Sequence, residues 1–176
     1  ELSRDIPLLA DGLVRPEKGD GAHFAEMARE LVAGAIEVVV TQEEPEHRTL
    51  IRVADLLLAP DLDDTLQAWA ENADLVGHRP AQIAATILRA GDRERGSIQT
   101  SVAKAFAWMQ SDAMRYFLKR SSFRMDDLLD DRIDLFIVVP LDQIDKQAVF
   151  MRLFINLVLG LVVRQDGRRK VKAPIL

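Results

Sequence analysis

The chain has 176 residues, enough for one substantial domain or for one domain and part of another, and its 48% hydrophobic content argues against disorder over most of its length. It has no cysteine, which excludes disulfides, thiolate zinc sites and a cysteine nucleophile. The formal charge of −5 is uneven, because residues 1–64 carry 6 basic and 15 acidic side chains while residues 131–176 carry 8 basic and 5 acidic ones. A uniformly basic clamp for nucleic acid is therefore excluded, but a local basic face is not.

The first 130 residues show the spacing of amphipathic helices. In residues 22–41, apolar residues such as Phe24, Ala28 and Leu31 recur at steps of three and four, which predicts a long helix with one buried face. The same periodicity and the helix-starting residues predict further helical segments at 6–14, 49–58, 63–72 (capped by Asp61), 80–90 (with Pro80 at its first position), 98–110, 112–119 (capped by Ser111) and 125–129.

The hydrophobic period changes at Ile133. Residues 133–139 are short, continuous and β-branched, and Pro140 follows them, which predicts a buried strand of a parallel sheet. Residues 147–164 then predict a helix that is apolar almost all round, and residues 173–176 are typical of the next strand. The sequence thus predicts a mainly α fold, with an all-α domain at 1–130 and a strand-helix-strand unit at 131–176.

Metal and membrane sites find little support in the sequence. Surface or capping roles are the better interpretation of the three histidines, which lack metal-site spacing: His23, His47 and His78. The carboxylates at 61–64 and 126–131 are better explained as solvated helix ends, since no calcium loop is present. The longest apolar run, 153–163, falls short of a membrane span and predicts a buried helix.

The sequence lacks the motifs of a self-sufficient active site. It contains neither a phosphate loop nor the glycine fingerprint of dinucleotide-binding proteins, and no aliphatic strand ends in Asp-Glu as a Mg²⁺-binding segment would. No serine has an identifiable base. We therefore predict no catalytic, cofactor-binding or metal-binding residue in this chain, and no ATP hydrolysis by the chain alone.

Basic and aromatic residues gather between residues 89 and 124. With the aromatics nearby they could form a groove for single-stranded nucleic acid, but composition favours aromatics in the core and arginines that solvate helix surfaces. If DNA or a protein partner is bound, the candidate contacts are Arg89, Arg93, Arg95, Arg115 and Lys119.

Residues 92–101, which read DRERGSIQTS, are followed by Ala-Trp-Met at 107–109 and resemble a signature of the TraG/TraD-like coupling proteins of type IV secretion. The candidate family motif within it consists of Glu94, Arg95, Gly96 and Ser97. Further matches occur in the family's order: residues 9–14, 22–24 and 28–34 resemble its first two helices, and residues 123–128, 137–140 and 152–154 resemble the return into its motor domain.

This resemblance implies a helical insert followed by part of a RecA-like nucleotide-binding domain, from a hexameric inner-membrane ATPase. It implies that the insert faces the cytoplasm without direct membrane contact, and recruits relaxase-bound DNA, accessory proteins or effectors. ATP and Mg²⁺ would be cofactors of a longer parent protein, of which we expect this chain to be an internal piece. The alternative is a free-standing helical adaptor without motor activity, which leaves residues 133–176 unexplained.

Overall fold

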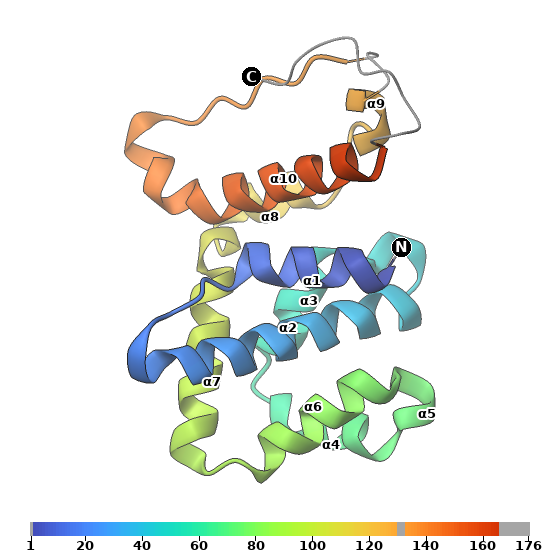
Figure 1. The fold of residues 1–176 in the computed structure, drawn as a ribbon, viewed down its shortest axis with the longest axis vertical. Coiled ribbons are helices and arrows are strands. Elements are labelled where there is room, and N and C mark those ends of the chain that lie inside the picture. The colour runs from blue at the N-terminus through green and yellow to red at the C-terminus, as the bar shows by residue number, and fades with distance from the viewer. Residues whose placement is uncertain (1, 130–132, 166–176) are drawn as a thin grey trace.

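The computed structural model of the protein describes residues 2–129 and 133–165, and this part of the chain is helical with no strand (Figure 1). The α-helices are α1 (Leu2–Leu13), α2 (Ala22–Gln42), α3 (Leu50–Leu57), α4 (Leu62–Glu71), α5 (Ala73–Val76), α6 (His78–Arg89), α7 (Asp92–Phe106), α8 (Asp112–Leu118), α9 (Met125–Leu129) and α10 (Ile144–Gln165). Short 3₁₀ turns occur at η1 (Gly19–Gly21), η2 (Pro45–His47), η3 (Ala107–Met109) and η4 (Leu141–Gln143).

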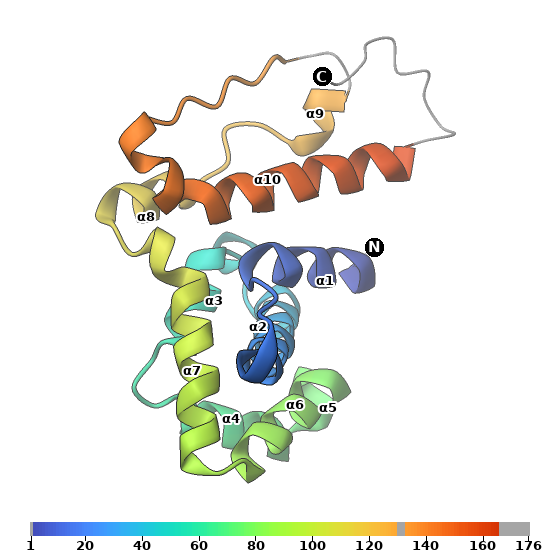
Figure 2. The ribbon, with the colours of Figure 1, turned by 60° about the vertical axis from the view of Figure 1, so that its left-hand side comes forward.

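The helices lie in three tiers along the longest axis, and α7 runs from the lower tier towards the upper one (Figures 1 and 2). The lower tier holds α4, α5 and α6, the middle one α1, α2 and α3, and the upper one α8, α9 and α10. Helix α2 is the centre of the bundle, because it contacts α1, α3, α6 and α7. The helical bundle predicted from the sequence is therefore confirmed.

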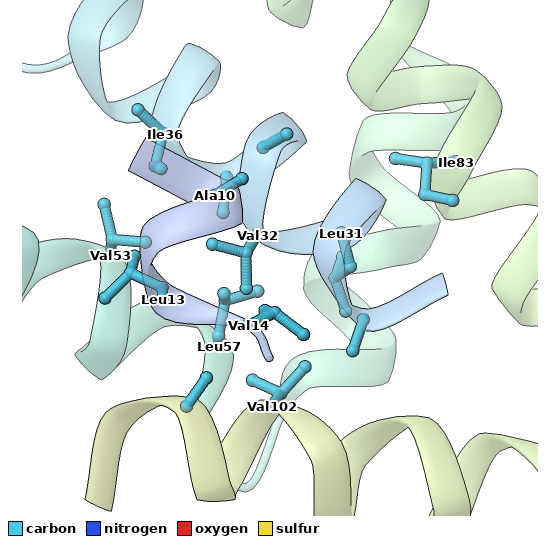
Figure 3. Close-up of a cluster of buried hydrophobic side chains, with 14 of the residues drawn as sticks. Ala10, Leu13, Val14, Leu31, Val32, Ile36, Val53, Leu57, Ile83 and Val102 are labelled. Carbon is cyan, nitrogen blue, oxygen red and sulfur yellow. The ribbon is translucent and has the colours of Figure 1, made fainter. Parts of the chain in front are cut away.

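The core forms around α2 because its inner face carries small and branched apolar residues. Leu31, Val32 and Ile36 of α2 are buried against side chains from four other helices (Figure 3). Gly34 lets α6 approach closely, since a Cβ there would lie 3.2 Å from Cγ2 of Ile83. The long helix predicted from the spacing at 22–41 is thus the central element of the fold.

Helix starts follow the predicted caps in one case and differ in two others. Ser111 caps α8, and its Oγ accepts a hydrogen bond from the backbone N–H of Met114 at 3.3 Å. Asp61 makes no side-chain cap, because its backbone (φ −96°, ψ 27°) is not in the extended conformation of a capping residue. Pro80 is the third residue of α6 rather than the first, because Gly77, with a φ of 97°, reverses the chain just before His78.

Helix α7 begins at Asp92, six residues before the predicted start at residue 98. The candidate family motif, Glu94 to Ser97, therefore lies within the first turns of a helix. Two acids, Asp92 and Glu94, favour this earlier start because they lie at the positive end of the helix dipole. Arg95 adds a salt bridge to Asp92 at 2.6 Å, which ties the first turn together.

The strand predicted at 133–139 is wrong for the described structure. Residues 133–140 form no regular element, and Phe136 and Val138 are 85% and 90% exposed. A strand requires a neighbour for its backbone hydrogen bonds, and the described residues offer none. The second predicted strand, at 173–176, lies outside the described residues, so the RecA-like piece and the domain boundary at residue 130 stay predictions.

The helix predicted at 147–164 is confirmed as α10, Ile144–Gln165, which packs on α1 and η3. Its apolar surface faces both ways, because Leu153 is buried against the bundle while Ile155, Leu159 and Val163 are exposed. Contrary to the expectation from the apolar run alone, residues 141–163 are long and apolar enough to cross a membrane. The buried helix predicted from this run is wrong for the described structure, where only 6% of that apolar segment is buried, and one such helix is weak evidence for a membrane span.

Candidate interface for nucleic acid or a protein partner

Three of the predicted contact residues lie at the start of α7 or just before it. Arg95 donates to Asp63 of α4 at 3.0 Å and to Asp92 at 2.6 Å, and its side chain is only 25% exposed. The hydrogen bond with Asp92, together with the charge of Asp63, raises the pKa of Arg95. Arg95 therefore braces α7 against α4, whereas Arg89 and Arg93 are exposed and have no side-chain partner among the described residues.

The rest of the candidate motif also connects helices. His23 of α2 places its Nε2 atom 2.9 Å from Oε1 of Glu94, so the starts of α2 and α7 are joined at the surface. Ser97 donates from Oγ to the carbonyl of Arg93 at 3.0 Å, within the helix. Gly96 is exposed, and a Cβ there would meet nothing within 4 Å, so packing within the described chain does not require glycine at this position.

The other two predicted contacts lie beyond the far end of α7: Arg115 on α8, and Lys119 directly after it. Arg115 donates from one guanidinium nitrogen to both carboxylate oxygens of Asp55, at 2.8 and 2.9 Å, and so ties α8 to α3. Lys119 directly follows α8, is exposed, and has no side-chain partner within the described ranges.

The five predicted contacts do not form one face. Helix α7 has 15 residues, which at 1.5 Å per residue separates its ends by roughly 22 Å. Arg89 ends α6, and Arg93 and Arg95 lie in the first turn of α7, whereas Arg115 lies on α8 and Lys119 follows it. Helices α6 and α8 lie at opposite ends of α7 (Figures 1 and 2). These residues are close in sequence, but the length of α7 keeps the two groups apart in space.

Sequence reasoning missed the exposed aromatics of α8. Trp69 and Trp108 are core residues, 5% and 7% exposed, as composition favours, but Tyr116 and Phe117 are 79% and 60% exposed. No residue of α8 is buried. A signal was present in residues 115–120, RYFLKR, where two aromatics stand between cations on a helix too short to carry a continuous apolar stripe.

A second feature missed from the sequence joins α1 to α10. Arg152 donates from Nε to the carbonyl of Gly12 at 2.9 Å and from a terminal nitrogen to that of Leu13 at 3.4 Å. Desolvation, followed by the charge of Arg15, lowers the pKa of Arg152. Beside it the helices touch, since a Cβ on Gly12 would lie 2.8 Å from Cδ1 and 3.3 Å from Cα of Leu153.

The described residues offer little for small-molecule chemistry. They contain no group of three or more acids and histidines that could hold a metal ion. A groove of about 440 Å³ runs between α1 and α10, lined by Arg4, Leu8, Asp11, Asn156, Leu159, Gly160 and Val163. Its lining is mostly apolar and has no nucleophile–base pair.

Comparison with known proteins gives one match. The family model described as type IV secretory system conjugative DNA transfer matches residues 2–174, nearly the whole chain. No curated protein and no solved structure matches the chain.

Proposed function

This chain belongs to the type IV secretory system conjugative DNA transfer family, and from that premise we propose that it is the substrate-recruiting helical domain of a coupling protein. In this proposal the longer parent is a hexameric inner-membrane ATPase, and the helical domain lies at its cytoplasmic face. There it receives relaxase-bound DNA, accessory proteins or effectors for the secretion channel.

The observation that carries the proposal is the family match over residues 2–174 of a chain whose described part folds as a helical bundle. In this proposal the helical bundle contributes binding, and a RecA-like part of the parent contributes hydrolysis. We therefore assign ATP and Mg²⁺ to segments of the parent outside this sequence.

The described surface supports recruitment in a second way. Acidic residues dominate the first 64 positions, whereas the second half carries the exposed cations Arg89, Arg93, Lys119 and Arg120, for which the described residues offer no carboxylate partner. A surface with separate acidic and basic regions favours partners that also carry both kinds of charge, such as a protein–DNA complex, over long bare duplex DNA.

The test is competition in donor cells. The chain is produced in large excess in cells that carry the parent system, and transfer of the mobile DNA is measured. If the chain recruits cargo, the excess binds cargo away from the parent and lowers the transfer frequency, and a tagged chain co-purifies with a relaxase, accessory protein or effector of the same system. Unchanged transfer together with no retained component of that system would refute the proposal.

The free-standing adaptor remains the second candidate, and one observation favours it. Residues 133–140 form no strand, and α10 packs on the bundle through Arg152 and Leu153 instead of covering a sheet. An adaptor would bind its partners with no effect on a motor. Measuring ATP hydrolysis of the parent with and without the added chain separates the two, because only a piece of the motor assembly should change that rate.

A further inference from the structure

At the end of α8 the structure reverses the interpretation that composition favours. Composition assigned the aromatics to the core, and Trp69 and Trp108 are indeed buried. Tyr116 and Phe117 are largely exposed, on a helix that contributes no buried residue. Large exposed aromatics that do not hold the fold are typical of a binding surface.

One of the two rings is rigidly supported. Phe117 packs edge-on against Phe150 of α10, with ring centroids 5.7 Å apart and planes at 83°, and Phe150 in turn lies 5.8 Å from Trp108. The ring of Phe117 thus rests on the partly buried Phe150, which contacts the buried Trp108, while more than half of the surface of Phe117 is open. A flat, fixed and open ring is what a stacking contact requires, because little conformational entropy is lost when a ligand binds.

Each ring is followed three residues later in the sequence by a cation. Lys119 retains helical backbone angles (φ −65°, ψ −31°) and comes three residues after Tyr116, so the two share a face. Arg120 comes three residues after Phe117. Neither Lys119 nor Arg120 has a side-chain partner in the part of the chain that the structure describes, whereas Arg115 is neutralised by Asp55.

The helix dipole alone would favour cations at this end of α8, but it does not account for the exposed aromatics. The one acid within α8, Asp112, lies in its first turn, at the opposite end of the helix. The end of α8 therefore combines two features, unpaired positive charge and open aromatic faces, that together suit a polyanion with stackable bases.

We propose that the end of α8 binds single-stranded DNA, with bases stacked on Phe117 and Tyr116 and phosphates held by Lys119 and Arg120. This inference rests on the proposed function, because it requires that the recruited cargo includes DNA. Paired bases are stacked on each other and cannot stack on a side chain, so single strands are preferred. The acidic first third of the chain further disfavours a long duplex, whose charge density is higher.

The experiment titrates the whole chain against a fluorescent oligothymidine, and against a duplex of equal length, at two salt concentrations. We expect the single strand to bind more tightly than the duplex. The double variant Tyr116→Ala/Phe117→Ala should weaken single-strand binding by roughly 5- to 150-fold for each base–aromatic stack that is lost. Replacing both rings with Trp should preserve binding, because indole stacks at least as well.

A charge variant and a matched control complete the design. Lys119→Ala/Arg120→Ala should weaken binding and lower the slope of log affinity against log salt by about 0.7 per lost phosphate contact. Arg89→Ala/Arg93→Ala removes two exposed cations at the other end of α7 and should leave affinity nearly unchanged. Circular dichroism checks that each variant is folded, and the charge variant still tests the proposal if the aromatic variant does not fold.

Equal or tighter binding of the duplex would overturn the proposal. So would an equal loss of affinity in the Arg89/Arg93 control, or no binding of the single strand by the unmodified chain. If the aromatic variant instead loses a relaxase or accessory protein and not DNA, the proposal is wrong and the surface is a protein-docking site. These failures leave the recruiting role intact, because competition in donor cells would still lower transfer.

Discussion

The contact between α1 and α10 should determine whether α10 stays docked on the bundle. The perturbation is Arg152→Ala, which removes the donor to the carbonyls of Gly12 and Leu13 in the last turn of α1. A hydrogen bond from a charged donor contributes about 1.5–3 kcal/mol. Desolvation of this guanidinium, which lowers the pKa of Arg152, opposes part of that gain. We therefore expect α10 to lose about 1–2 kcal/mol of docking free energy.

Hydrogen exchange measures this loss segment by segment, because amides of α10 exchange when the helix undocks locally. A loss of about 1–2 kcal/mol corresponds to exchange in α10 that is roughly 5- to 30-fold faster, while α2, at the centre of the bundle, keeps its rate. Arg152→Lys should restore part of the protection, because an ammonium can still donate to one carbonyl.

Two glycines provide a matched control. Gly12→Ala places a methyl group 2.8 Å from Cδ1 and 3.3 Å from Cα of Leu153, so α10 has to shift, at a cost of about 1–3 kcal/mol for overpacking. Gly96→Ala gains helix propensity with open space around it. Unchanged exchange in α10 of both Arg152→Ala and Gly12→Ala would refute the reasoning. Equal acceleration in α2 would also refute it, since α10 would then be part of one cooperative unit.

Three further predictions concern activity, the brace at Arg95 and association. The chain should show no micromolar binding of Mg-ATP by calorimetry, because it lacks a phosphate loop, and saturable binding would contradict this. Arg95→Ala should lower the denaturation midpoint through loss of its pairs with Asp63 and Asp92, whereas Arg93→Ala should leave the midpoint nearly unchanged in the same denaturant titration. The exposed apolar residues at 135–138 and on α10 should cause the chain to dimerise, which light scattering detects. The double variant Phe136→Asp/Val138→Asp should shift the chain towards monomer. A purely monomeric unmodified chain would count against this surface.

The hydrophobic periodicity correctly predicted the helices that pack against neighbouring helices along the whole of one face. Helix α2 is the clearest case, because its apolar steps of three and four continue for five turns and each step meets a neighbouring helix. Periodicity gave the wrong result at residues 133–139, where a continuous β-branched run describes a buried strand only if a sheet is present to bury it. Local sequence can indicate that a segment is suited to a sheet, but it cannot supply the sheet.

The candidate site was harder to predict, because the role of a cation depends on whether it pairs with a carboxylate and not on how many basic residues surround it in the sequence. Arg95 and Arg115 stand among equally basic neighbours, yet the fold brings each to a carboxylate far away in sequence, Asp63 and Asp55. No spacing rule gives those distant partners. Once these two paired arginines are set aside, Lys119 and Arg120 at the end of α8 are the cations beside open aromatics. This combination is why we place the proposed contact with nucleic acid at the end of α8 and not at the start of α7.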